Sequence, residues 1–234
     1  IREKLVTALN MPLGREGNLL IETPAHCRQL YLDSPILLPA SLAAIQASDH
    51  DTVKSSTLKL AWPIAGDGKA LSLAMDQLCR DAARKVQAGA RLLVLTDKGL
   101  SDTDAPIPAL LATSAVHHHL ITTGLRSKGG VVVETGEARE IHHFCCLLGY
   151  GAGAVVPWLA LASIEQLVRE KHLGETDSGQ ACARYLEAVN KGILKVLSKM
   201  GISTLQSYRG AQIFEFVGID PTVVGRYFIG TESR

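Results

Sequence analysis

Apolar residues gather in four short runs along the middle of the chain. In the first run, apolar and polar residues alternate, which is typical of a strand, and the run ends at Pro63. The next two runs contain only Leu and Val, as expected for strands buried on both faces of a parallel sheet. The pattern predicts strands at residues 58–63, 92–95, 131–133 and 154–157.

A helical pattern follows each of these strands. The first is the clearest, because Asp67 is a typical N-cap residue, apolar residues recur at helical spacing, and Gly89 suits the C-terminal end. In the second helix, Pro106 and Pro108 are expected in the first turn, where a missing N–H costs little. Helices are predicted at about 68–88, 106–123, 137–148 and 159–171.

Strands that alternate with helices predict an α/β fold built from successive parallel βα units. Four such units in series match either half of an eight-stranded TIM-like barrel or part of a doubly wound sheet. The pattern of the residues leaves both alternatives open.

The segments on either side of these units are less regular. Before them, Gly and Pro interrupt the chain, and short helices are expected at residues 24–32 and 41–47. After them, a long helix over about 180–198 precedes short, turn-rich elements. The chain thus divides into an irregular N-terminal segment, a βα-repeat core and a C-terminal part: residues 1–57, 58–173 and 174–234.

The composition of the chain limits the kinds of partner that it is expected to bind. Apolar residues make up 47% of the chain and aromatic residues 5%, so the core is expected to be mainly aliphatic. The formal net charge is +1 without a block of one sign, and no apolar run is long enough for a membrane span. We therefore expect neither nucleic acid nor a membrane as partner. The five scattered cysteines have no CxxC spacing, which favours reduced thiols in a cytosolic-type compartment.

Two groups of neighbouring histidines, His117–His119 and His142–His143, raise the question of a metal site. Adjacent residues on a helix point about 100° apart, so they do not direct their nitrogens at one ion. The HExxH pattern of zinc enzymes is absent. We interpret both groups as structural, with His117–His119 near a helix C-terminus, where partial positive charge is favourable.

Neither the glycine-rich stretches nor the paired cysteines predict a catalytic site. Gly149–Gly153 follow a predicted helix, whereas a dinucleotide-binding loop follows a strand and opens a helix. Gly66–Gly68 lack the Lys-Ser/Thr of a phosphate-binding loop. Cys145 and Cys146 fall within an apolar helix, where burial makes thiols unreactive. No catalytic, cofactor-binding or metal-binding residue is therefore predicted in this chain.

Polar residues follow the second and third predicted strands: Thr96 and Asp97, then Glu134 and Thr135. Parallel strands end at one edge of a sheet, where the functional residues of such folds gather, so these four are expected to meet. Two interpretations stay open. Either these residues serve a function at the strand ends, or residues 134–137 cap and charge the helix that follows.

Several long stretches carry the motifs of a known family. Residues 192–217 read GILKVLSKMGISTLQSYRGAQIFEFV, and this is the most specific stretch. Residues 108–125 read PALLATSAVHHHLITTGL, and residues 132–151 read VVETGEAREIHHFCCLLGYG. Gly17-Asn18-Leu19-Leu20 and Ser34-Pro35-Ile36-Leu37 belong to the same pattern. Together these stretches resemble glutamate synthase of the large-subunit or single-chain type, over nearly the whole chain.

The resemblance implies a central domain with a partial TIM-barrel-like fold, similar to FMN-linked oxidoreductases. In this family the domain lies between a glutamine amidotransferase domain and an FMN-binding synthase domain of the same chain. The enzyme converts glutamine, 2-oxoglutarate and two electrons into two glutamates, using FMN and an iron–sulfur cluster. These cofactors and the catalytic residues are expected outside this region. A small reductase subunit or ferredoxin is the expected electron donor, in the cytoplasm or the plastid stroma.

The sequence departs from the family pattern near the ends of two predicted strands. Lys98 stands where the family has Arg, and Gly153, Val156 and Trp158 stand where Asp, Asn and Tyr are usual. We therefore expect no polar role for the end of the fourth strand.

Two functions are compatible with these features. In the first, the chain is a noncatalytic scaffold that holds two active sites in register and walls an ammonia route between them. Thr96, Asp97, Glu134 and Thr135 are then the candidate residues of that wall or of the interdomain contact. In the second, the chain is an independent small barrel enzyme that uses the carboxylates at the strand ends.

Overall fold

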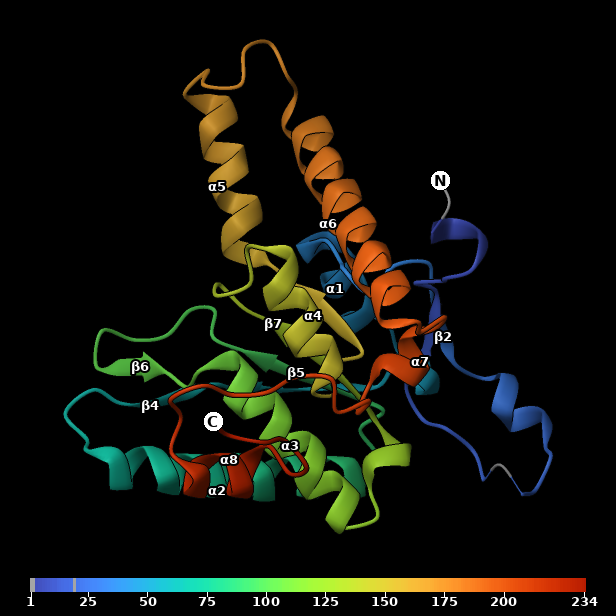
Figure 1. The fold of residues 1–234 in the computed structure, drawn as a ribbon, viewed down its shortest axis with the longest axis vertical. Coiled ribbons are helices and arrows are strands. Elements are labelled where there is room, and N and C mark those ends of the chain that lie inside the picture. Colours follow the sequence, from blue (N-terminus) through green and yellow to red (C-terminus); the bar gives the residue numbers. More distant parts are fainter. Residues whose placement is uncertain (1–2, 19) are drawn as a thin grey trace.

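A four-stranded parallel sheet lies at the centre of the computed structural model, which describes residues 3–18 and 20–234 (Figure 1). Leu19, part of the Gly17–Leu20 motif, lies outside the described residues. The strands, in sheet order, are β3 (Ser55–Lys59), β5 (Leu92–Thr96), β7 (Gly130–Glu134) and β8 (Ala154–Val156). The helices that connect them are α2 (Gly68–Gln87), α3 (Ala109–Thr122) and α4 (Ile141–Gly149).

The strands occur in the sheet in the same order as in the chain, and all three neighbouring pairs are parallel. Helices α2, α3 and α4 share one apolar core with the strand residues Leu93, Leu95, Val131, Val133 and Val155, so these helices cover one face. This is the winding of a barrel segment, because a doubly wound sheet carries helices on both faces. The prediction of an α/β fold of parallel βα units is confirmed, and the barrel-like alternative holds.

The opposite face of the sheet is covered by chain that precedes the βα units. Leu92, Val94, Val132, Ala154 and Val156 share a second core with this chain. Its elements are the antiparallel hairpin β1 (Met11–Leu13) and β2 (Leu30–Leu32), and helix α1 (Pro39–Gln46). In a closed barrel this face would point into the interior. The N-terminal segment therefore forms a layer that replaces the missing half of a barrel.

The hairpin approaches the sheet closely at Gly130, the first residue of β7. A Cβ atom at this position would lie 2.8 Å from Leu13 Cδ1 and 3.0 Å from the backbone nitrogen of Gly14. Since the second contact is with backbone, a side chain here would push the hairpin away from the sheet. Glycine thus permits the second layer to pack directly on the strands.

The outer edge of β8 is also covered by the N-terminal segment. Val155 donates its N–H to the carbonyl of Pro35 over 2.8 Å, and its own carbonyl accepts from Leu37 N–H over 2.9 Å. Ile36 therefore forms a parallel bridge with Val155, although this single bridge does not extend into a strand.

The predicted strand at residues 58–63 is in fact two strands. The chain leaves the main sheet after β3 and forms β4 (Ala61–Pro63), which pairs with β6 (Asp104–Pro106) as a separate antiparallel ribbon. Leu60 lies at the junction, donating to Thr96 O over 2.8 Å and accepting from Ile107 N over 3.1 Å. Pro106 therefore belongs to a strand, so its prediction in the first turn of a helix was wrong.

Helix boundaries follow the predictions where a local cap is present. Helix α2 begins as predicted, because Asp67 Oδ1 accepts from Lys69 N over 2.9 Å and from Ala70 N over 3.1 Å. Helix α4 begins at Ile141 and not near residue 137, since the preceding residues make contacts at the strand ends. The helix predicted at 24–32 was wrong: this stretch contains the 3₁₀ helix η2 (Pro24–Cys27) and strand β2.

The C-terminal part packs onto the same core as the βα units. Its long helix α6 (Ser178–Met200) lies beside α5 (Trp158–Arg169), the last helix of the βα units, and both project from the sheet (Figure 1). Leu197 and Leu205 share the helix-side core with Leu9 and Leu60 from the other parts of the chain. The remaining short helices are η1 (Glu3–Leu5), η3 (Asp51–Val53), η4 (Arg126–Lys128), α7 (Leu205–Tyr208) and α8 (Pro221–Tyr227). Within the described residues, no helix is both long and apolar enough to cross a membrane.

The N-terminal layer is expected to contribute strongly to stability. Leu13 is 2% exposed against the sheet, whereas Leu20 in the same segment is 92% exposed. Leu13→Ala should lower the free energy of unfolding by about 2–5 kcal/mol, because it leaves a cavity between the two layers. Leu20→Ala should change it by less than about 0.5 kcal/mol. Urea denaturation of both variants measures this difference, and equal effects would show that the layer is not tightly packed.

Candidate functional site

The carboxyl ends of β5 and β7 lie side by side, because the register pairs Thr96 with Glu134. The structure brings Thr96, Asp97, Glu134 and Thr135 together at this edge. Three of the four are buried: Thr135 is 0% exposed, Thr96 3% and Asp97 9%. These residues form two small hydrogen-bonded networks, one around Asp97 and one around Glu134. The two networks differ in their exposure to solvent.

The Asp97 carboxylate is held by donors from three residues, two in the loop after β7 and one at the start of α5. Thr135 Oγ1 donates to Oδ2 over 2.5 Å, and Gly136 N–H lies 3.0 and 3.1 Å from the two carboxylate oxygens. Trp158 Nε1, at the first turn of α5, donates to Oδ1 over 2.7 Å. A buried carboxylate needs such donors to offset its loss of hydration. Asp97 therefore ties the ends of β5 and β7 to the start of α5, and its lone pairs are occupied within the protein.

Trp158 contradicts the expectation that the end of the fourth strand has no polar role. Its indole N–H provides the donor that fixes Asp97 from the side of β8. Sequence reasoning missed this because it treated tryptophan only as an apolar replacement for a family residue. A buried tryptophan usually finds a partner for its N–H, and that signal was present in the sequence.

The second network surrounds Glu134, whose side chain is 14% exposed. Thr96 Oγ1 donates to Oε2 over 2.7 Å, and Lys98 Nζ lies 3.8 Å from Oε1. The Thr96 hydroxyl also accepts from Lys98 N–H over 3.1 Å. Since Lys98 is half exposed, Glu134 is the one of the four predicted residues whose carboxylate lies at the boundary with solvent.

Glu137 caps a helix, but it is the preceding helix and not the following one. Its Oε2 accepts from the N–H of Ala109, the first residue of α3, over 2.9 Å. At the start of α4 the acceptor is His143 Nδ1, which lies 3.2 Å from Arg139 N and 3.3 Å from Glu140 N. The interpretation that residues 134–137 cap α4 was therefore wrong. Burial raises the pKa of Glu137, the Ala109 hydrogen bond opposes this, and nearby Asp97 adds to it.

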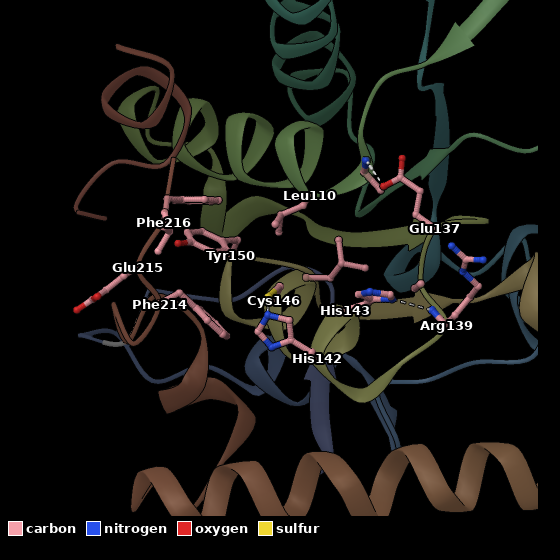
Figure 2. Close-up of a pocket in the computed structure, with 14 residues that line it drawn as sticks. Leu110, Glu137, Arg139, His142, His143, Cys146, Tyr150, Phe214, Glu215 and Phe216 are labelled. Atoms are coloured by element: carbon pink, nitrogen blue, oxygen red, sulfur yellow. Dashed lines mark hydrogen bonds between the residues drawn. The ribbon is translucent and has the colours of Figure 1, made fainter. Parts of the chain in front are cut away.

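A pocket of about 470 Å³ lies beside this network, between α3, α4 and the C-terminal segment (Figure 2). Figure 2 shows Glu137 and Arg139 at one end and the side chains of Phe214 and Phe216 at the other. Tyr150 stacks on Phe214 with ring centroids 5.8 Å apart. Sequence reasoning did not find this pocket, because its aromatic wall comes from residues far along the chain.

The pocket contains a cysteine next to a histidine, but the thiol is not activated. Cys146 Sγ lies 3.5 Å from His142 Nε2. Burial, with a smaller effect of Cys145, raises the pKa of Cys146 to about 12. Nucleophilic cysteines have lowered pKa values, so this pair lacks the charge state needed for attack.

The histidine group on α3 has contacts within the protein. His117 is buried, and its Nδ1 accepts from Arg126 Nε over 2.8 Å. Burial, then the charge of Arg126, lowers the pKa of His117 to about 3, so the ring is neutral at pH 7. The expectation that positive charge explains this histidine is therefore wrong. Over residues 3–18 and 20–234, no group of three or more His, Cys, Asp or Glu side chains is arranged to hold a metal ion.

Comparison with protein families identifies the domain to which this fold and these networks belong. Residues 1–220 match the family described as "Glutamate synthase central domain". The chain belongs to this family. The resemblance of its motifs to glutamate synthase is therefore confirmed, and the strand-end network is a feature of a glutamate synthase central domain.

Curated relatives align with the domain over its whole length. It is 42% identical to "Glutamate synthase [NADPH] large chain" of Bacillus subtilis, covering 100% of this chain and 15% of the relative. It is 40% identical to "Glutamate synthase [NADH]" of Schizosaccharomyces pombe, covering 100% of this chain and 11% of the relative. "Ferredoxin-dependent glutamate synthase 2" of Synechocystis is 42% identical, with 100% and 16% covered. The chain thus spans only a small part of the length of these relatives.

Solved structures with a similar fold have low sequence identity to this chain. A mutant mandelate oxidase with the monooxide FMN adduct is 11% identical at a TM-score of 0.49, covering 88% of this chain and 90% of that chain. A mutant flavocytochrome b2 with benzoylformate is 15% identical at a TM-score of 0.47, covering 57% and 31%. The barrel-like assignment of the central domain rests on its own strand order.

Asp97 is expected to stabilise the domain through its charge. Asp97→Asn keeps the size of the side chain but replaces one acceptor oxygen with a donor that faces other donors. The free energy of unfolding should fall by about 1.5–3 kcal/mol, as for other hydrogen bonds to a buried charge. Asp102→Asn, at an exposed position of the same loop, is the control and should change it little. Equal stability of both variants in urea would contradict a structural role of Asp97.

The neutral state of His117 predicts a dependence of stability on pH. The unfolded chain binds a proton at this residue below pH 6.5, whereas the folded chain does so only near pH 3. In that window acid lowers the free energy of unfolding by up to about 1.4 kcal/mol per pH unit. His117→Gln removes this contribution, so urea denaturation should show a smaller loss of stability between pH 7 and pH 5. Parallel losses in both proteins would show that His117 binds protons equally well in the folded state.

Proposed function

We propose that this chain is the noncatalytic central domain of a glutamate synthase, linking a glutamine amidotransferase domain to an FMN-binding synthase domain. The family match over residues 1–220 carries this proposal. The small share of each relative that the chain spans supports it, since the remaining length leaves room for both catalytic domains. The whole enzyme forms two glutamates from glutamine, 2-oxoglutarate and two electrons. Its relatives are named for NADPH, NADH and ferredoxin, so the sequence family does not fix the donor.

FMN and an iron–sulfur cluster are assigned in this proposal to other parts of the enzyme. Two features of the described residues support this assignment. At the strand ends, the N–H of Gly136, which could have faced a phosphate, donates to Asp97. An iron–sulfur cluster requires several cysteines gathered in space, and the described residues contain no group of three or more His, Cys, Asp or Glu side chains that could hold a metal ion.

The packing of the sheet supports a scaffold over an independent small barrel enzyme. An enzyme built on these strands would need an open pocket at their carboxyl ends. Instead, Asp97 is fully engaged with Thr135, Gly136 and Trp158. The second face of the sheet, where a barrel enzyme has its interior, is filled by apolar side chains of the N-terminal layer. A rigid, filled domain is suited to hold its neighbours at a fixed separation.

The proposal includes a wall for ammonia, and Glu134 is its best candidate residue. Ammonia released by the amidotransferase must reach the synthase site without escaping into water. Asp97 and Thr135 are buried and hydrogen-bonded to each other, so in this proposal they stabilise the strand ends and do not contact ammonia. Glu134 is partly exposed, and one of its oxygens lies 3.8 Å from the ammonium group of Lys98, which sits on a long, flexible side chain. Thr96 fixes the other oxygen and thereby orients the carboxylate.

Glu134→Gln in the full-length enzyme tests this role. The change keeps the size of the side chain and removes its charge, which weakens the contacts to Thr96 and Lys98. We expect glutamine hydrolysis to exceed 2-oxoglutarate conversion, because ammonia escapes before it reacts. Both fluxes are measured in the same reaction.

The control is Glu187→Gln, which removes an exposed ion pair with Lys191 on α6 and should leave the fluxes equal. If Glu134→Gln also leaves them equal and only lowers the thermal midpoint, Glu134 has a structural role alone. The family assignment would stand in that case, but the proposed wall would not.

A further inference from the structure

Two arginines that are distant in sequence meet at the amino ends of β7 and β8. Arg126 in η4 is fixed by three acceptors: His117 Nδ1 at 2.8 Å, Gly129 O at 2.9 Å and Gly151 O at 3.1 Å. None of these acceptors carries a negative charge. Burial, with a further effect of Arg209, lowers the pKa of Arg126 to about 10, so its guanidinium is still charged at pH 7.

Arg209, directly after α7, has far fewer partners. Its Nη2 lies 4.0 Å from the sulfur of Met11, a weak acceptor, and its Nε is buried without any hydrogen-bond partner. Burial lowers the pKa of Arg209 as well. Within the described residues, neither Arg126 nor Arg209 is within ion-pair distance of a carboxylate. A partly buried charge without a partner is costly, which makes Arg209 the unusual member of the pair.

Arg209 borders a cavity of about 570 Å³, which we call the arginine cavity. Its lining comes from the N-terminal segment, α3 and the end of α7: Pro12, Glu16, Gly17, His26, Gln29, His117, Gln206 and Arg209. Because His117 Nδ1 accepts from Arg126, the proton of the neutral ring is on Nε2, which makes that nitrogen a donor. The amide of Gln206 and the guanidinium of Arg209 are further donors around the same space.

Glu16 is the carboxylate whose charge acts on both arginines. It raises the pKa of Arg126 and of Arg209, against the effect of burial. Its side chain is exposed and makes no ion pair with Arg126 or Arg209. Its backbone N–H is held by Ser127 O over 2.7 Å, which fixes this part of the cavity rim. Two guanidinium groups and one carboxylate that pairs with neither leave a positive charge uncompensated.

We propose that the arginine cavity binds a carboxylate group, with the guanidinium of Arg209 as its principal donor. The planar fork of a guanidinium matches the two oxygens of a carboxylate. A singly charged group fits the site better than a phosphate dianion. Arg126 already donates to three acceptors within the protein, and Glu16 adds negative charge nearby. The carboxylate belongs either to a free small acid or to an Asp or Glu side chain of an adjoining domain.

This site is separate from the strand-end network and does not depend on the proposed wall for ammonia. Arg126 and Arg209 contact Gly129, Gly151 and Met11 at the amino ends of the strands. Asp97 and Glu134 lie at the carboxyl ends. A failure of one proposal therefore leaves the other unaffected.

Thermal unfolding of the 234-residue chain in sodium acetate or sodium succinate, against sodium chloride at equal ionic strength and pH 7, tests the site. We expect the carboxylates to raise the unfolding temperature and chloride not to do so. Arg209→Gln should weaken succinate binding about tenfold or more, as expected when a charged hydrogen-bond partner is lost. Arg209→Lys should restore it only in part, since an ammonium group lacks the fork.

Two further variants separate this site from general effects of charge. Arg184→Gln removes an exposed arginine on α6 and should leave succinate binding unchanged. Glu16→Gln should tighten binding, because it removes the competing negative charge. In chloride, Arg209→Gln should be at least as stable as the unmodified chain, because an unpaired, partly buried charge is removed. This result also guards against mistaking an unfolded variant for one that cannot bind.

The longer parent protein distinguishes the two sources of the carboxylate. If succinate still stabilises it in an Arg209-dependent manner, the site takes a free acid. If succinate has no effect while Arg209→Gln lowers the stability of the parent, an acidic side chain of an adjoining domain occupies the site. The proposal is overturned if acetate and succinate act like chloride on the 234-residue chain, or if Arg209→Gln binds succinate as well as the unmodified chain does.

Discussion

The structure depends on the need to cover both faces of an open parallel sheet. Every strand position of β5 and nearly every position of β7 and β8 is buried, so neither face can meet water. Crossovers of one hand place α2, α3 and α4 on a single face, and a closed barrel would hide the other face in its interior. Here the sheet stays open, and the hairpin β1–β2 with α1 takes the place of the missing strands.

This arrangement explains why the strand ends differ from those of a barrel enzyme. With the second face filled, there is no central cavity for the strand-end side chains to enter. Asp97 and Thr135 turn to each other and to Trp158, and they fasten α5 to the sheet. The same chemistry that could bind a substrate stabilises the frame instead. Glu134 is the strand-end carboxylate that lies outside this network, bonded to Thr96 and close to Lys98.

Much of the fold could be predicted because the signals for it are local. The buried strands are runs of Leu and Val, and α2 carries its own cap at Asp67. The gathering of Thr96 and Glu134 followed from parallel register alone. The prediction merged β4 with β3 and divided β6 between a loop and a helix, because the β4–β6 ribbon forms by pairing between distant segments. The family was identified from contiguous motifs, which do not depend on tertiary structure.

The contacts that were predicted wrongly are those between elements that are not neighbours in sequence. Glu137 precedes α4, and a rule based on sequence proximity assigns it to that helix, but folding brings Ala109 to it. Trp158 reaches back to Asp97 in the same way. No pattern in the sequence indicates that Arg126 and Arg209 lie close enough to affect each other's charge, since they belong to segments that are distant along the chain. Long-range partners of single polar residues were therefore beyond sequence reasoning.

The bridge between Ile36 and β8 has a consequence for how the domain can meet the rest of a larger protein. Edge strands with free backbone groups invite another chain to add a strand. At β8, Pro35 and Leu37 already use both backbone groups of Val155. A neighbour at this edge cannot continue the sheet across the boundary and must recognise side chains. The surface shape and side chains of the domain, and not strand pairing across this edge, then determine the orientation of the neighbour.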